Sequence, residues 1–142
     1  LFVAVEPKGG RRTVVVTDHR AKVDFVAFVQ HLLKQVYATA RRIHLVMDNL
    51  NTHFRKSFEE VLGVKKANAL LRRVVFHYTP THGSWLNQIE LWFGLVSRRV
   101  LRHGQFEGPD QLVSAIEVFI EVWNTKEGHP FRWTYRGRPL VS

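Results

Sequence analysis

The spacing of apolar and polar residues changes once in the first forty positions, near residue 20. Residues 1–5 and 13–17 are short runs rich in β-branched and aromatic residues, with glycines and a proline between them. This arrangement predicts a β-hairpin with a glycine turn. Between residues 22 and 38 the apolar positions recur every three to four residues, which predicts an amphipathic helix. The chain is therefore expected to open with a hairpin followed by a helix.

Two later apolar runs have the length of strands. Ile43–Met47 lies between an arginine pair and an aspartate and suits a strand buried on both faces. Val74–Tyr78 is a second short strand, stopped by a proline. Between them a helix is predicted over residues 52–62, closed by Gly63, whereas the basic residues 65–72 are ambiguous. The two strands are thus separated by helical sequence.

The C-terminal half predicts two longer helices. Ser84 can cap a helix that runs to about Arg102, and a Gly-Pro-Asp sequence at residues 108–110 opens the last helix. The apolar stripe of the first of these consists of Trp85, Ile89, Trp92, Phe93, Val96 and Val100. Strands that pair early and then alternate with helices predict a single α/β domain over residues 1–142, a sheet with helices on its faces.

The net charge of the protein indicates which class of molecule it binds. The 142 residues carry 21 Lys and Arg against 12 Asp and Glu, a formal charge of +9, and 14 of the cations are arginines. This balance favours a polyanion, nucleic acid first, although a solvated basic surface is the alternative. The absence of cysteine excludes disulfides and thiol nucleophiles and is typical of cytoplasmic proteins. No apolar run is long enough for a membrane span, so none is expected.

Two carboxylates stand where an α/β fold builds ligand sites. Asp48 ends the apolar strand at residues 43–47, and Glu90 lies at the flank of the stripe on the helix after the next strand. Taken singly, Asp48 is better explained as a helix cap and Glu90 as a solvent-exposed side chain. If the two strands are neighbours, both acids can converge, and a cation between them would relieve their repulsion. Hard oxygen ligands favour Mg²⁺ or Mn²⁺, which beside arginines suits phosphodiester cleavage.

Three segments together resemble one family. The segment Thr79–Phe93 (Thr-Pro-Thr-His-Gly-Ser-Trp-Leu-Asn-Gln-Ile-Glu-Leu-Trp-Phe) resembles the third acidic motif of bacterial insertion-sequence transposases in the mariner-like DDE superfamily. Leu45–His53 resembles the second acidic motif of this family, and His129–Thr134 resembles its C-terminal ending. The resemblance implies an RNase H-like mixed sheet flanked by helices. It also implies a DDE triad, with Asp48 as the second acid and Glu90 as the third.

The resemblance further implies that the family's first strand and its DNA-binding region are not among these residues. The opening run at residues 1–5 resembles the family's second strand, so we expect a fragment without the first strand, its aspartate and the N-terminal helix-turn-helix region. Glu6 and Asp18 are poor replacements for that acid because hairpin ends are usually solvated. Gln88 replaces a common proline without moving the acid. We therefore expect little or no activity from this chain alone, and self-association through unpaired strand edges.

The implied function is the catalytic core of a cut-and-paste DNA transposase in the bacterial cytoplasm. It would use Mg²⁺ or Mn²⁺ for hydrolysis and strand transfer, bind transposon ends and target DNA, and form a homo-oligomer. The alternatives are a non-catalytic DNA-binding or subunit-pairing remnant and another RNase H-like nuclease. Candidates for supporting the metal ligands or contacting DNA are Asn49, His53, His82, Asn87, Arg98, Arg99 and Arg102, with Arg72, Arg73, Arg132, Arg136 and Arg138 extending a basic track. For each of these a structural or solvated role is the alternative, and the histidine spacing does not predict a zinc site.

Overall fold

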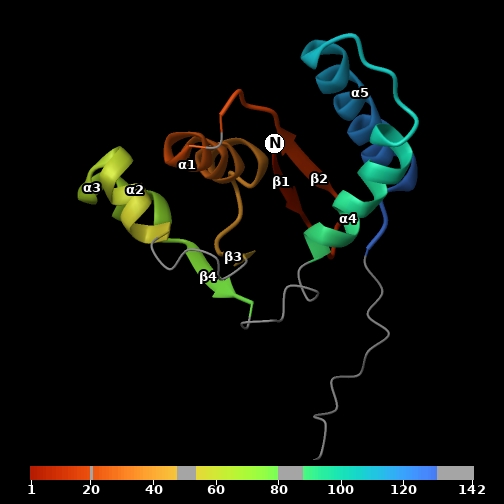
Figure 1. Ribbon diagram of the computed structural model, residues 1–142. Helices are drawn as coiled ribbons and strands as arrows, with labels where there is room; N and C mark the ends of the chain where they lie inside the picture. The colour runs from red at the N-terminus through yellow and green to blue at the C-terminus, as the bar shows by residue number, and fades with distance from the viewer. Residues whose placement is uncertain (20, 48–53, 80–87, 131–142) are drawn as a thin grey trace, which may run out of the picture.

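The computed structural model describes residues 1–19, 21–47, 54–79 and 88–130, which form a mixed α/β fold (Figure 1). Its elements in chain order are β1 (Phe2–Val5), β2 (Arg12–Val15), α1 (Lys22–His31), η1 (Leu32–Val36), β3 (Ile43–Met47), α2 (Phe54–Leu62), α3 (Val64–Leu71), β4 (Val74–Tyr78), α4 (Gln88–Val96), η3 (Ser97–Leu101), α5 (Pro109–Val122) and η4 (Trp123–Glu127). The three η segments are π-helical turns that continue the helix before them.

The predicted N-terminal hairpin is confirmed. β1 and β2 pair antiparallel, with Phe2 opposite Val15 and Val5 opposite Arg12. The turn between them ends at Gly10, whose φ of +74° is a conformation that side chains disfavour. A Cβ atom at this position would also lie 2.6 Å from the backbone of His129. Glycine is therefore required at Gly10 both by the turn and by the approach of the C-terminal segment.

β3 and β4 form a parallel pair. Ile43 lies opposite Val74 and Met47 opposite Tyr78, and the backbone N–H of Thr79 donates to the carbonyl of Met47 at 2.9 Å. Both strands consequently end at the same edge, as convergence of the two acids requires. Among the described residues, however, β1–β2 and β3–β4 are separate two-stranded sheets and not the single sheet that we expected, because no described strand bridges the two pairs.

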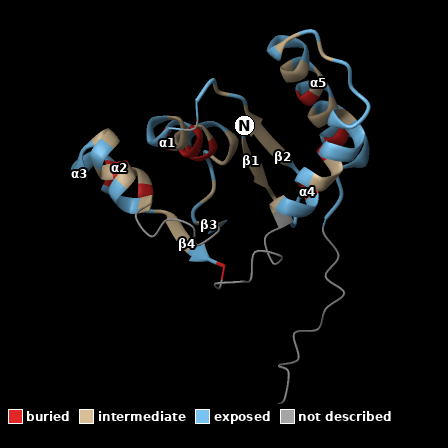
Figure 2. Ribbon diagram, viewed as in Figure 1, coloured by how far each residue is buried: buried red, intermediate tan, exposed pale blue. Residues whose placement is uncertain are grey.

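The main core covers one face of the β3–β4 pair. Its buried side chains come from α1, η1, α2 and α3, namely Val26, Val29, Leu33, Phe58, Ala67 and Leu71. Ile43, Val74 and Phe76 pack against this cluster from the strands. On the opposite face His44 is exposed and Val46 keeps 54% of its surface exposed. The ribbon of β4 is likewise tan and pale blue, the colours of partly buried and exposed residues (Figure 2). The expectation that residues 43–47 are buried on both faces is therefore wrong, because helices cover only one side.

The hairpin lies between α1 on one side and the helices α4 and α5 on the other (Figure 1). The ring of Phe2 packs 5.7 Å from that of Phe28 on α1. On the other side, Trp92 of α4, buried to 1% exposure, contacts Phe119 of α5 at a centroid distance of 6.5 Å. The hairpin contacts this second group through Arg12, whose guanidinium lies 5.0 Å from the ring centroid of Trp123 in η4, and so connects the two helical groups.

The predicted helices are present, but some of their bounds and buried faces differ from the prediction. The ambiguous residues 65–71 belong to α3, whose C-cap is Arg72, and the long helix expected from Ser84 is described as α4 followed by η3. Ser84 and Trp85 lie outside the described residues. Phe93, placed on the apolar stripe, is 39% exposed, because the buried face of α4 is centred on Trp92 and Val96. Within the described residues no helix is long and apolar enough to cross a membrane.

Candidate functional site

The carboxyl ends of β3 and β4 define the position of the candidate site. Met47 and Tyr78 are partners in the parallel register, so the chain leaves both strands at one edge. In α/β folds this edge is where ligands bind. Asp48, the residue after Met47 in the sequence, lies outside the described residues, as do Asn49, His53, His82 and Asn87.

Glu90 is the acid of the predicted site that the structure describes. It lies in the first turn of α4 and is exposed, while its neighbour Trp92 is buried. The positive end of the helix dipole stabilises a carboxylate in a first turn. α4 itself packs against β1. Among the described residues no ion pair involves Glu90, so its carboxylate oxygens are open to a cation.

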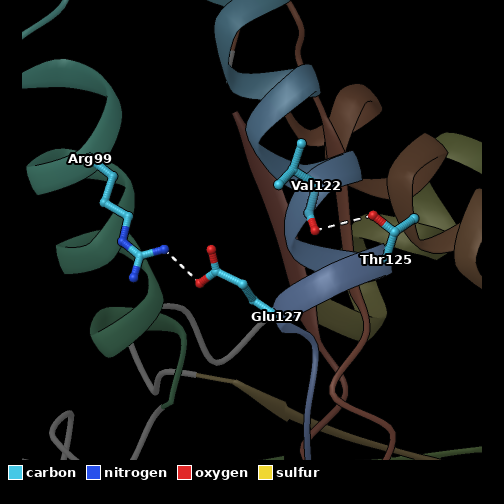
Figure 3. A network of polar contacts seen from close by, with 4 residues as sticks. All are labelled: Arg99, Val122, Thr125 and Glu127. Atoms are coloured by element: carbon cyan, nitrogen blue, oxygen red, sulfur yellow. Dashed lines mark hydrogen bonds and ion pairs between the residues drawn. The ribbon is translucent and has the colours of Figure 1, made fainter.

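The three arginines after α4 differ in their surroundings. Arg98 and Arg102 are exposed, and their spacing of four residues places them on one side of the helix. Arg99 instead donates from Nη1 to Oε2 of Glu127 at 2.6 Å (Figure 3). Its guanidinium also lies 5.5 Å from the ring centroid of Trp123. Arg98 and Arg102 are therefore freer to meet a DNA backbone than Arg99, which connects η3 to η4.

Arg73, which the sequence analysis placed on a basic track, is engaged within the fold. Its guanidinium donates hydrogen bonds from Nη1 to the carbonyls of Tyr37, Ala38 and Ala40, at 3.0, 2.9 and 2.7 Å, and from Nη2 to the carbonyl of Leu33. These bonds fix the guanidinium against the backbone, in contrast to the exposed Arg98 and Arg102. Arg132, Arg136 and Arg138 lie outside the described residues.

A comparison with protein-family models identifies the chain. The model described as DDE superfamily endonuclease matches residues 1–113. The chain belongs to this family. The match runs from β1 into α5 and includes both Asp48 and Glu90. Searches of curated proteins and of solved structures find no match.

Enzymes of the DDE superfamily generally use divalent metals and act on DNA. The chemistry of the donors fits such an ion, because Glu90 offers exposed carboxylate oxygens and cysteine is absent. Within the described ranges no cluster of three or more histidine and acidic side chains could hold a metal. Asp48, the other acid that the sequence analysis predicts as a metal ligand, lies outside these ranges.

One pair of polar side chains near the site was missed by the sequence analysis. His44 of β3 and His77 of β4 approach each other on the exposed face, with Nδ1 and Nε2 2.8 Å apart. Metal-binding spacing on a helix does not reveal a pair of this kind, because the two histidines lie on different strands. The signal lies in the parallel register, which sets His77 opposite Val46, two residues along β3 from His44. A hydrogen bond between the rings requires one nitrogen to donate and the other to accept.

Proposed function

We propose that the chain is the catalytic core of a DNA transposase of a bacterial insertion sequence, of the mariner-like type. The observation that carries the proposal is the DDE family match, which includes both sequence-predicted acids. The shared edge of β3 and β4 adds support, because Met47, which precedes Asp48 in the sequence, lies opposite Tyr78 at that edge. In this proposal Asp48 and Glu90 are metal ligands, and the fold is RNase H-like.

The proposed reaction is hydrolysis of a phosphodiester at the transposon end, followed by attack of the freed 3′-hydroxyl on target DNA. A divalent ion would polarise the phosphate and help to generate the attacking oxygen nucleophile. Glu90 and Asp48 would hold the ion, with Asn49, His53, His82 and Asn87 orienting these ligands or the phosphate. Arg98 and Arg102 would contact the DNA backbone, which contributes affinity and little sequence information.

The proposal includes a requirement for a third acid. Residues 1–142 would form one domain that supplies two acids of the triad, Asp48 and Glu90, whereas Glu6 and Asp18 are poor candidates for the remaining one. The 142-residue chain alone is then expected to bind DNA and a divalent ion weakly and to leave DNA uncut. Metal-dependent nicking by this chain that Asp48→Asn abolishes would contradict the requirement.

Manganese binding tests the assignment of the two acids. We expect Asp48→Asn and Glu90→Gln each to weaken Mn²⁺ binding by at least about tenfold, because loss of a ligand costs more than loss of its supporting hydrogen bond. Binding is measured from the electron paramagnetic resonance signal of free Mn²⁺. Asp110→Asn is the matched control, since Asp110 is also an exposed acid in the first turn of a helix.

The outcomes separate the competing functions. Equal Mn²⁺ affinity in all three variants and the parent would contradict the metal site. DNA binding that is unaffected by Mn²⁺ and by both acid substitutions would favour the non-catalytic remnant. Metal-dependent cutting of DNA that needs both Asp48 and Glu90, in a protein that supplies these residues together with a third acid, would establish the enzyme.

A further inference from the structure

The side chain of Asn124 forms hydrogen bonds with the backbone at one end of the outer edge of β2, where a neighbouring strand would otherwise pair. Oδ1 of Asn124 accepts a hydrogen bond from the backbone N–H of Arg12 at 2.8 Å, and its Nδ2 donates to the carbonyl of Arg12 at 2.8 Å. Two bonds exchanged with one residue are the pattern of an antiparallel strand partner. The backbone of Arg12 therefore faces away from β1, toward η4.

The backbone N–H and carbonyl groups of successive strand residues point alternately to the two edges of the strand. Because groups of every second residue point to the same edge, the N–H and carbonyl of Val14 face outward like those of Arg12. Those of Thr13 and Val15 face β1, opposite Ala4 and Phe2. Within the described part of the chain β2 pairs with β1 alone, so the edge at Val14 has no strand partner.

A groove follows this open edge. It has a volume of about 380 Å³ and is lined by Val14, Val15 and Val16 on one side and by Glu117, Ile120 and Glu121 of α5 on the other. Side chains of successive strand residues point to opposite faces, so three in a row can line one groove only if it exposes the backbone edge. Val14 and Val15 belong to β2 and Val16 follows it directly, so the groove lies alongside this strand.

The charge on the α5 side of the groove is opposite to that of the whole protein. Glu117 and Glu121 are exposed and one helical turn apart, and like charges at this spacing destabilise a helix. Neither forms an ion pair with another described residue. Two unneutralised carboxylates in a chain of net charge +9 therefore mark a place that suits a cationic partner.

We propose that the outer edge of β2 binds an extended segment of a partner protein that carries lysine or arginine side chains. The segment adds a strand beside Val14, as in recognition by β-strand addition. Its basic side chains meet Glu117 and Glu121, while its apolar side chains contact Val16 and Ile120. Pairing of β2 with β2 of a second copy is disfavoured, because it would bring four carboxylates together.

The test uses the 142-residue chain and a synthetic peptide of alternating arginine and valine. We expect Val14 to gain protection from amide hydrogen exchange when the peptide binds, while Thr13 and Val15, already directed toward β1, serve as internal references. The double variant Glu117→Gln, Glu121→Gln should weaken binding by about three- to thirtyfold, since each exposed ion pair contributes little. Asp110→Asn, at the other end of α5, is the matched control and should leave the affinity unchanged.

A second peptide separates strand addition from simple charge attraction. N-methylation of alternate backbone nitrogens, on the edge that would face β2, removes the donors needed for a ladder and leaves the charge intact. This peptide should bind at least about tenfold more weakly, because several backbone hydrogen bonds are lost. Equal binding of the methylated peptide, no protection at Val14, no effect of the double variant or no binding of either peptide would each overturn the proposal.

Discussion

At the scale of single residues, Arg73 shows how a charged side chain can organise the backbone. Its four carbonyl partners come from Leu33, in η1, and from the segment between η1 and β3. The neighbouring Tyr37 in turn donates from its hydroxyl to Glu6 at 3.1 Å. Burial raises the pKa of Tyr37 to about 12, and the negative charge of Glu6 acts in the same direction. Arg73 and Tyr37 thus connect β4, η1 and the hairpin.

We expect Arg73→Lys to lower the free energy of unfolding by roughly 1–2 kcal/mol, because an ammonium group cannot reproduce the planar fork of donors. Urea denaturation measures the change. The neighbouring Arg72 is exposed, so Arg72→Lys is the matched control and should change stability little. Equal stabilities of the two variants would show that the carbonyl contacts do not stabilise the fold.

At the scale of elements, a single glycine separates α2 from α3. Gly63 has φ +80° and ψ 151°, a region that is almost confined to glycine. Its N–H donates to the carbonyl of Glu59 at 2.9 Å, and its carbonyl accepts from Ala67 at 3.0 Å. The glycine therefore ends one helix and begins the next, which sets Phe58 and Leu71 into the same core.

Gly63→Ala is expected to destabilise the protein by about 1–3 kcal/mol through backbone strain alone, since no heavy atom lies within 4 Å of the added Cβ. Gly108→Ala isolates this cause. Gly108 also precedes a helix and has equal space, but its φ of −172° is extended and open to any residue. Thermal unfolding of the two variants should differ clearly, and coincident melting curves would contradict the argument.

Much of the secondary structure could be predicted from local patterns. The hairpin, the strands at residues 43–47 and 74–78 and the closure of the helix by Gly63 follow from β-branched runs, helical spacing and glycine. The role of Arg73 could not be predicted, because its carbonyl partners lie more than thirty positions away. The exposure of Phe93 was not predicted, because helical spacing places it on the same apolar stripe as Trp92. Only the packing of α4 against α5 shows that Trp92 is buried and Phe93 is not.

At the scale of the whole molecule, the two strand pairs leave several edges open. β1–β2 and β3–β4 do not hydrogen-bond to each other among the described residues, and the outer face of β3–β4 exposes Val46 and His44. Parallel strands are usually covered on both faces. Exposed strand edges favour pairing with another chain. The fold is therefore expected to acquire further strand pairing, from additional sequence or from another molecule.

We expect the 142-residue chain to self-associate as its concentration rises, with an average mass above the 16.6 kDa of one chain. Light scattering over a concentration series measures this mass. High salt should leave the association intact or strengthen it, because the net charge of +9 opposes contact between copies. A single species of monomer mass at high concentration would contradict the expectation.

The sequence by itself determined the DDE motifs, the sign of the charge and the order of strands and helices. These properties depend on residue identity and on contacts between near neighbours. The tertiary structure decided that β3 and β4 are parallel partners, that helices cover only one of their faces, and that Arg73 donates to four backbone carbonyls. It also decided that Asn124 occupies one end of an open strand edge beside two carboxylates. Such features depend on residues far apart in the chain, which periodicity and propensity do not relate to one another.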